Sequence, residues 1–282
     1  MHTVYYQTES KQVIESERMK RVLFTCNIEN TNIFLGVFDG QTNVFNSRLA
    51  TSDRKSSDEY AILISNIFSM YHVALLSING AIISSVVRPL NAILSQAIEK
   101  LMHVKPLMVG PGLKTGLNIK TDIPSQVGAD IVANAVAAVS LARYPMVLVD
   151  FGTATTLTGI NENGELCGVM ICPGVRSSLD ALSAQAAELP SVAPESPKHL
   201  FGKNTVDAMV SGIVNGYASM IDGLLDRIAD EWHTEKVDVI ATGVFADPVL
   251  AYCRCRHDIQ YEPNLALLGL HRIYNLNVRP RI

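Results

Sequence analysis

The segment Asp150-Phe151-Gly152-Thr153-Ala154-Thr155 follows the apolar run Met146–Val149 and leads into a second apolar run that ends at Ile160. This pattern predicts a strand, a short polar turn and a second strand. A carboxylate at the strand end can hold a cation or water near phosphates, the glycine lets backbone N–H groups approach anionic oxygens, and the hydroxyls donate to them. Taken alone, the four residues Asp150–Thr153 also fit an ordinary β-turn.

A second copy of this pattern lies 123 residues earlier, where Asn27-Ile28-Glu29-Asn30-Thr31 separates two apolar runs. Each copy is followed by a hairpin signal (Asp39-Gly40 and Asn163-Gly164), a third strand-like run and a helical pattern. The repetition predicts an α/β fold made of two duplicated β-β-β-α halves. We expect the two polar turns to face each other across a cleft.

Composition limits the class of protein. The chain has 282 residues, is 48% hydrophobic and 18% charged, and carries a net charge of −4, which excludes disorder and coiled coil. The absence of a Lys/Arg run argues against nucleic acid as a partner. No apolar stretch approaches the roughly 20 residues of a transmembrane helix, so no membrane is expected. We expect an N-terminal extension over residues 1–20, a first half over 21–143 and a second half over 144–282.

The cysteines indicate a reducing compartment. There are five, an odd number, and most lie in apolar segments with a strand-like pattern. A disulfide framework is therefore not expected, and we expect a cytoplasmic location. Cys253 and Cys255 lack a second His/Cys pair at ligand spacing and are interpreted as reduced thiols. Residues 1–20 are polar and do not have the apolar core of a signal peptide.

Two helix starts carry candidate chemistry. Ala129–Ala142, made mostly of Ala and Val, is predicted to be a helix with Asp130 in its first turn. An acid there is explained equally by the helix dipole and by a catalytic role. Asn204 is predicted to cap a long helix from Thr205, with Asp207 three residues further on.

Two other motifs fail on spacing. Gly112-Leu113-Lys114-Thr115 lacks the glycine directly before the lysine that a P-loop requires. Ser84-Ser85 lacks the flanking glycines of a nucleophile elbow and is interpreted as a buried strand end.

From Val22 to Tyr274 the sequence resembles the type III pantothenate kinases, a family of the sugar-kinase/actin superfamily. The resemblance is carried by segments in both halves: Asn30-Thr31-Asn32, Gly110–Ile119, Val127-Gly128-Ala129-Asp130, Asp150–Thr156, Pro173-Gly174, Leu189-Pro190, Gly202–Val206 and Ala241-Thr242-Gly243. It implies a homodimer with ribonuclease-H-like halves that phosphorylates pantothenate from ATP, the first step toward coenzyme A. It also implies Mg²⁺ and a monovalent cation, K⁺ or NH₄⁺.

The resemblance also implies site residues. Asp130 matches the general base, which suits phosphoryl transfer because the reaction needs positioning, charge neutralisation and one proton acceptor. Asp150 matches the monovalent-cation ligand. ATP contacts fall on Asn27, Glu29, Asn30, Thr31, Asn32 and Thr153, and pantothenate contacts on Thr121, Gly128, Ala129, Asp130, Ile131 and Thr205.

The first turn departs from the family motif, which reads Asp-x-Gly-Asn-Thr. Asn27 supplies no charge to a metal or its waters, and Glu29 adds a side chain and a carboxylate near the triphosphate. Two like charges about 4 Å apart cost roughly 4 kcal/mol at an effective dielectric constant of 20, or nearly three decades of affinity. We therefore expect weakened ATP binding. Glu29 would share a strand face with residue 27, and its taking over the lost acid's task stays open.

Three smaller departures lie elsewhere: Val244 replaces the second glycine of a Thr-Gly-Gly turn, Ile131 an arginine and Thr121 a tyrosine. Two functions therefore stay open beside an active kinase. One is a non-enzymatic paralogue that serves as a regulatory protein or as one subunit of a heteromer. The other is an actin-like ATPase with another substrate, against which the loop Gly110–Asn118 argues.

Overall fold

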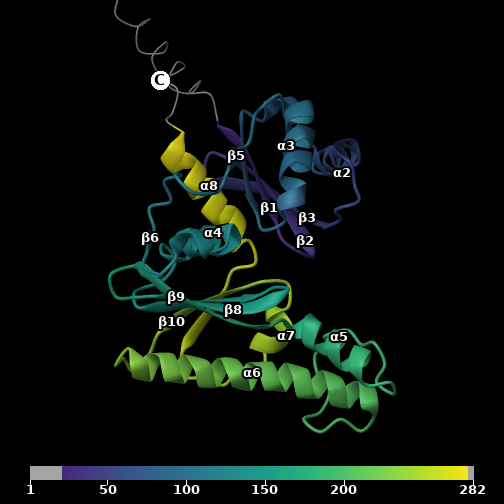
Figure 1. The fold of residues 1–282 in the computed structure, drawn as a ribbon, viewed down its shortest axis with the longest axis vertical. Coiled ribbons are helices and arrows are strands. Elements are labelled where there is room, and N and C mark those ends of the chain that lie inside the picture. The colour runs from purple at the N-terminus through teal and green to yellow at the C-terminus, as the bar shows by residue number, and fades with distance from the viewer. Residues whose placement is uncertain (1–20, 279–282) are drawn as a thin grey trace, which may run out of the picture. The chain divides into compact units, whose positions relative to one another are not determined.

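The computed structural model describes residues 21–278, and the expected extension over residues 1–20 lies outside them. The chain divides into two compact units, residues 21–109 and 110–278, each built on its own β-sheet (Figure 1). All five cysteines are free thiols. Among the described residues, no helix combines the length and apolar character needed to cross a membrane.

The first unit contains a five-stranded sheet in the order β3-β2-β1-β4-β5. Its elements are β1 (Val22–Ile28), β2 (Asn32–Asp39), β3 (Thr42–Ala50), α2 (Ser57–Met70), η1 (Leu75–Ser77), β4 (Gly80–Ser85), α3 (Arg88–Met102) and β5 (Leu107–Met108). The predicted hairpin at Asp39-Gly40 is confirmed, since it joins the antiparallel strands β2 and β3 with Gly40 at φ +61°. Helix α2 begins with a capping box in which Ser56 and Glu59 exchange hydrogen bonds.

The second unit contains a six-stranded sheet in the order β11-β10-β7-β8-β9-β6. Its strands are β6 (Asn118–Ile119), β7 (Met146–Phe151), β8 (Ala154–Ile160), β9 (Glu165–Pro173), β10 (Asp238–Thr242) and β11 (Asp258–Tyr261). Its helices are η2 (Pro124–Gln126), α4 (Ala129–Ala138), α5 (Val175–Gln185), α6 (Thr205–Glu231), α7 (Ala246–Leu250) and α8 (Leu265–Asn277). The predicted cap of α6 is confirmed, because the Asn204 side chain accepts from the Asp207 N–H.

The predicted duplication is visible in the two sheets. Strands β9-β8-β7-β10-β11 repeat the order and directions of β3-β2-β1-β4-β5, with antiparallel hairpins and parallel pairing of the fourth and fifth strands. The buried faces also correspond. Phe24, Cys26 and Ile28 pack in the core of the first unit, and Val147, Val149 and Phe151, each 123 residues later, pack against α6 in the second.

The division of the chain differs from the predicted boundary at 143/144. Residues 110–143 group with the second unit, because β6 pairs with β9 and α4 packs on α8 and on the β7 face of the same sheet. The glycine-rich segment after Gly110, which was expected to be a loop, thus ends in an edge strand. Strand β11 was not predicted either.

Helices cover both faces of the second sheet. Figure 1 shows α4 and α8 on one face and α6 on the other. The strand alternation matches this arrangement: Met146 and Leu148 pack with the α4 side, while Val147 and Val149 pack with the α6 side. A residue of β7 with an even number therefore faces α4.

The approach of α8 to α4 depends on Gly269. A Cβ at this position would lie 1.7 Å from the Ala133 carbonyl oxygen. We predict that Gly269→Ala lowers the free energy of unfolding by about 3 kcal/mol, because overpacking forces the two helices apart. Urea denaturation measures this, and Gly168→Ala is the control, since a Cβ at Gly168 in β9 meets nothing within 4 Å. Equal stabilities of the two variants would contradict this packing.

Candidate functional site

Asp150 lies one residue before the end of β7, on the face that α4 covers. Its register partners are Thr156 on β8 and Thr242 on the parallel strand β10. Because Asp150 continues the series of Met146 and Leu148, its carboxylate points to the α4 side of the sheet. The predicted turn thus places its acid against a buried helix.

Asn134 connects this acid to α4. Its Nδ2 donates to Asp150 Oδ2 at 3.1 Å, the side chain is buried, and its Oδ1 has no hydrogen-bond partner among the described residues. Asp130 lies four residues earlier, on the same helix face. Asn134 was not among the predicted site residues, although it is the one amide in the Ala/Val helix and follows Asp130 at the spacing of one turn.

The two carboxyl groups influence each other. Burial, followed by the negative charge of Asp130, raises the pKa of Asp150 to about 7. Burial also raises the pKa of Asp130, opposed by the hydrogen bond that its Oδ1 accepts from the Ile131 N–H at 2.8 Å. Two partly buried acids of like charge are stabilised by a shared proton or by a cation. The cluster is therefore suited both to accepting a proton and to holding a positive ion.

Close backbone approach frames both acids. Gly243 has φ +98°, and a Cβ there would lie 2.6 Å from Asp150 Oδ1. A Cβ at Gly128, which precedes α4, would lie 2.4 Å from Asp130 Oδ1. Each glycine therefore leaves the space that one carboxylate occupies.

The first turn has a different chemistry. Asn27 is fully buried, and its Nδ2 donates to Glu29 Oε1 at 2.8 Å, which confirms that residues 27 and 29 share a face. The Glu29 N–H donates to the Asn32 carbonyl at 2.9 Å, and the Thr51 hydroxyl donates to the Glu29 carbonyl at 2.6 Å. Asn30 and Thr31, between them, are exposed.

The remaining predicted residues are placed as follows. In the second unit, Thr153 is exposed in the turn after Asp150 and its carbonyl accepts from Ser177 Oγ at 2.8 Å. Ala129 begins α4, and Ile131 packs at the edge of the apolar cluster beneath it. The Oγ1 of Thr121 is buried without a hydrogen-bond partner among the described residues. Thr205 opens α6 and lines, with Lys203 and Leu189, a hollow of about 570 Å³.

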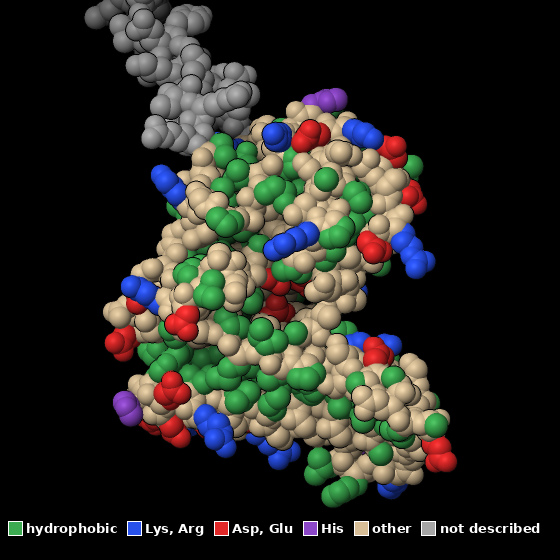
Figure 2. Space-filling model, in the orientation of Figure 1, with side chains coloured by type: hydrophobic (Ala, Val, Ile, Leu, Met, Phe, Trp, Pro, Cys, Tyr) green, Lys and Arg blue, Asp and Glu red, His purple; other side chains and the backbone are tan. Residues whose placement is uncertain are grey.

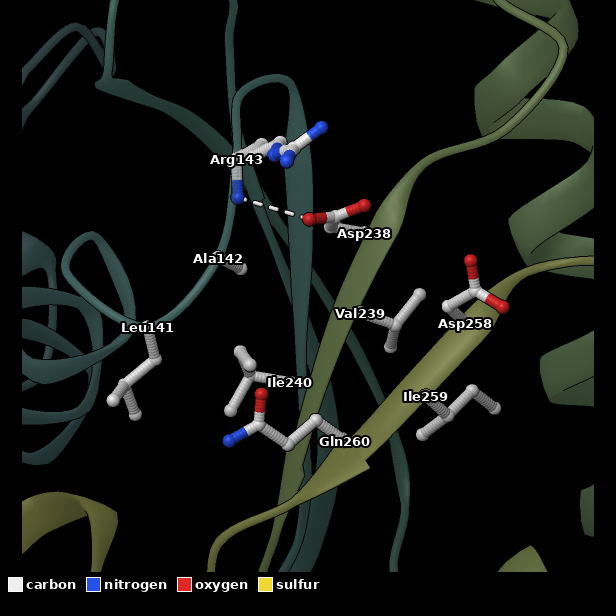
Figure 3. A pocket seen from close by; sticks show the side chains of 9 residues that line it. All are labelled: Leu141, Ala142, Arg143, Asp238, Val239, Ile240, Asp258, Ile259 and Gln260. Carbon is white, nitrogen blue, oxygen red and sulfur yellow. Dashed lines mark hydrogen bonds between the residues drawn. The ribbon is translucent and has the colours of Figure 1, made fainter.

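A second hollow, of about 340 Å³, lies at the amino ends of β10 and β11 in the second sheet (Figure 3). It is lined by the starts of β10 and β11, and the Arg143 backbone N–H donates to Asp238 Oδ2 there at 2.9 Å. Ligands of open α/β sheets bind at the carboxyl ends of the strands. Asp150 and Thr242 lie at that carboxyl end, so this hollow is separate from the acid cluster.

The raised pKa of Asp150 gives a pH dependence of stability. Between about pH 4 and pH 7 the folded state holds a proton that the unfolded state releases, so the free energy of unfolding falls as pH rises through this range. We predict that Asp150→Asn removes this fall, and that the variant gains stability relative to the unsubstituted chain on going from pH 5 to pH 8. Urea denaturation in tetramethylammonium buffer, free of K⁺ and NH₄⁺, measures it. A difference that stays constant with pH would contradict the pKa shift.

Comparison with solved structures supports the fold. The chain resembles a 2-dehydro-3-deoxygalactonokinase protein described as putative, from Sinorhizobium meliloti (TM-score 0.53, 11% identity, covering 92% of this chain and 99% of that one). It also resembles MreB 5 of Spiroplasma citri (TM-score 0.51, 10% identity, covering 90% and 96%). At these identities the likeness concerns architecture, and it confirms the predicted actin/sugar-kinase-like α/β class.

Sequence comparison gives the family. The model of the type III pantothenate kinase family matches residues 23–227. A type III pantothenate kinase of Halalkalibacterium halodurans is 43% identical over 257 residues, covering 91% of this chain and 100% of its own length. The type III pantothenate kinase of Myxococcus xanthus is 40% identical over 256 residues, covering 91% and 99%. These matches cover most of the chain, including Asp130, Asn134 and Asp150, and they show that this chain belongs to the type III pantothenate kinase family.

Proposed function

We propose that this protein is a cytoplasmic pantothenate kinase that transfers the γ-phosphoryl group of ATP to pantothenate, giving 4′-phosphopantothenate for coenzyme A synthesis. The observation that carries the proposal is the Asp130–Asp150 cluster. It lies in a chain that matches relatives named type III pantothenate kinase over almost their whole length. None of the relatives compared above is described as a regulatory subunit, so nothing favours the non-enzymatic alternative.

Asp130 is the proposed general base. Its pKa lies above the usual value for an aspartate because of burial, which brings it closer to the pH at which a base works best. Its carboxylate would accept the proton of the pantothenate hydroxyl as the phosphoryl group arrives. Thr121, Gly128, Ala129 and Ile131 precede or begin the same helix and are the proposed substrate contacts, together with Thr205.

Asp150 is the proposed ligand of the monovalent cation, K⁺ or NH₄⁺. The donor set fits, because Asp150 offers a carboxylate and Asn134 an unpartnered, buried amide oxygen. A cation supplies the positive charge that two neighbouring acids lack, and it would keep Asp150 ionised near neutral pH. We propose ATP contacts, with Mg²⁺ as its counter-ion, at Thr153 and at the first-unit residues Asn27, Glu29, Asn30, Thr31 and Asn32.

We further propose a homodimer that forms through α6. An exposed strip of small residues runs along this helix, consisting of Gly212, Gly216, Ser219 and Gly223, and a Cβ at any of the three glycines meets nothing within 4 Å. Phe201 and Leu200, just before the helix, are 86% and 69% exposed. Small residues allow two helices to approach closely, and exposed apolar side chains beside them favour a protein partner. On the face drawn in Figure 2, acidic and basic side chains are interspersed. This face therefore lacks the basic patch that a nucleic-acid partner would need.

The catalytic assignment predicts the effect of Asp130→Asn. The amide cannot accept the hydroxyl proton, so we expect the turnover number to fall 10²- to 10⁴-fold while ATP affinity stays within about threefold. A coupled ADP-release assay with pantothenate measures turnover, and calorimetry measures ATP binding. Asp258→Asn is the matched control, because Asp258 lies on β11 at the far end of the sheet. Unchanged turnover in Asp130→Asn would contradict the role.

The dimer assignment predicts the effect of Gly216→Leu. A leucine on the small-residue strip of α6 should separate the subunits and weaken dimerisation at least tenfold, as measured by light scattering across a dilution series. Gln96→Leu, an exposed substitution on α3, should leave dimerisation unchanged. A monomeric unsubstituted protein, or an undiminished dimer in Gly216→Leu, would contradict the assignment.

A further inference from the structure

The carboxyl end of β1 holds an amide and a carboxylate that form one hydrogen-bonded unit. Asn27 Nδ2 donates to Glu29 Oε1 at 2.8 Å, Asn27 is fully buried and Glu29 partly so. An aspartate at position 27 would have the same shape as Asn27, with an oxygen where Nδ2 now lies. The negative charge is therefore displaced outward by one hydrogen bond relative to the family motif, and it is retained.

Two buried oxygens, one of the Asn27 amide and one of the neighbouring strand, have no hydrogen-bond partner among residues 21–278. They are Asn27 Oδ1 and Ser84 Oγ, both on fully buried residues. The parallel pairing of β1 with β4 sets Asn27 directly beside Ser84, so the two oxygens come from the same level of adjacent strands. A buried polar atom without a partner costs about 1–3 kcal/mol, which indicates that water or a ligand completes this place.

The backbone accommodates Glu29 without strain. The non-glycine residues with positive φ in the described part of the chain are His72, His103 and His233, so Glu29 does not need glycine's left-handed conformations. Hydrogen bonds to Asn32 and from Thr51 hold its N–H and carbonyl. The backbone of Glu29 is therefore held within the first unit, and the Asn27 amide contacts its carboxylate.

The residues at positions 27 and 29 depend on each other. With Asp at position 27, two carboxylates would meet across the 2.8 Å that now separates Nδ2 from Oε1, and they would repel. With Asn there, the amide N–H stabilises the ionised form of Glu29. The group offered at this end is then an oxygen set of one carboxylate, one amide oxygen and one hydroxyl. Mg²⁺ prefers oxygen ligands, keeps several waters, and is typically held by one or two carboxylates plus substrate phosphates.

We propose that Glu29, positioned by Asn27, is the carboxylate that meets the hydrated Mg²⁺ of MgATP in this chain. The acid that faces the metal then stands at position 29 instead of position 27. This inference rests on the proposed kinase function. It replaces the expectation of a repelled triphosphate, because the charge of Glu29 is unfavourable to ATP alone and favourable to ATP that carries Mg²⁺.

The Mg²⁺ dependence of ATP affinity tests the proposal. Calorimetry measures ATP binding with excess Mg²⁺ and with excess EDTA in the unsubstituted protein, Glu29→Gln, Asn27→Asp and the double variant Asn27→Asp/Glu29→Gly. We expect Glu29→Gln to lose at least tenfold in affinity for MgATP while binding of metal-free ATP is unchanged or tighter. Asn27→Asp alone should also weaken MgATP binding, and the double variant, which restores the family motif, should recover it. A change in structure alone would lower both affinities together.

Matched controls separate the outcomes. Glu99→Gln makes the same change on the exposed end of α3 and should alter neither affinity, and thermal unfolding verifies that each variant is folded. MgATP binding by Glu29→Gln as tight as that of the unsubstituted protein, or tighter, would overturn the inference and leave the kinase function standing. A folded protein that binds MgATP with the expected Glu29 dependence, yet forms no phosphopantothenate, would overturn the function and support the inference.

Discussion

The repulsion between two partly buried carboxylates, Asp130 and Asp150, is the constraint on which the site in the second unit depends. Burial makes each charge unfavourable, and the charge of Asp130 adds to the pKa of Asp150. Hydrogen bonds offset part of this cost, because Asn134 donates to Asp150 and the Ile131 N–H donates to Asp130. A proton or a cation would offset the remaining negative charge. A site of this kind stores the affinity for a positive ion and the capacity to accept a proton in the same few side chains.

The fold around the pair follows from small residues. Helix α4 approaches β7 closely because its buried side chains are mostly alanines and valines, and α8 reaches α4 because residue 269 has no side chain. These features bring Asn134 within hydrogen-bonding distance of Asp150. Bulkier residues at the same positions would hold the helix farther from the sheet and separate the amide from the acid.

Much of this arrangement is predictable from the sequence, because it depends on local patterns. The repeated strand-turn-strand units, the Asp39-Gly40 and Asn163-Gly164 hairpins, and the Asn204 cap are set by nearby residues. Strand β6 is not predictable in this way, since it has two residues and exists through pairing with β9. The contact of Asn134 with Asp150 joins residues 16 apart across two elements, and periodicity only places the amide on a helix face. The unit boundary differs from the predicted one for the same reason.

The first turn shows where charge arguments from sequence stop. From residue types alone, an exchange of Asp for Asn and Gly for Glu appears as the loss of one useful charge and the gain of one harmful charge. In the folded chain the two positions are linked, because the Asn27 amide donates to the Glu29 carboxylate. A penalty calculated for an isolated carboxylate near phosphates therefore leaves out the amide donor and, under the inference above, the charge of Mg²⁺.

The state of ionisation of the acid pair tests the account most directly. Carbon-13 NMR of labelled aspartate side chains, with Asp130 and Asp150 assigned by substitution, follows each carboxyl group through pH 3 to 9. We predict that the Asp150 carboxyl titrates near pH 7 without K⁺ or NH₄⁺. Removing the Asp130 charge should lower this pKa, and K⁺ should lower it as well. Ordinary titration of both carboxyl groups near pH 4, insensitive to each other and to K⁺, would contradict it.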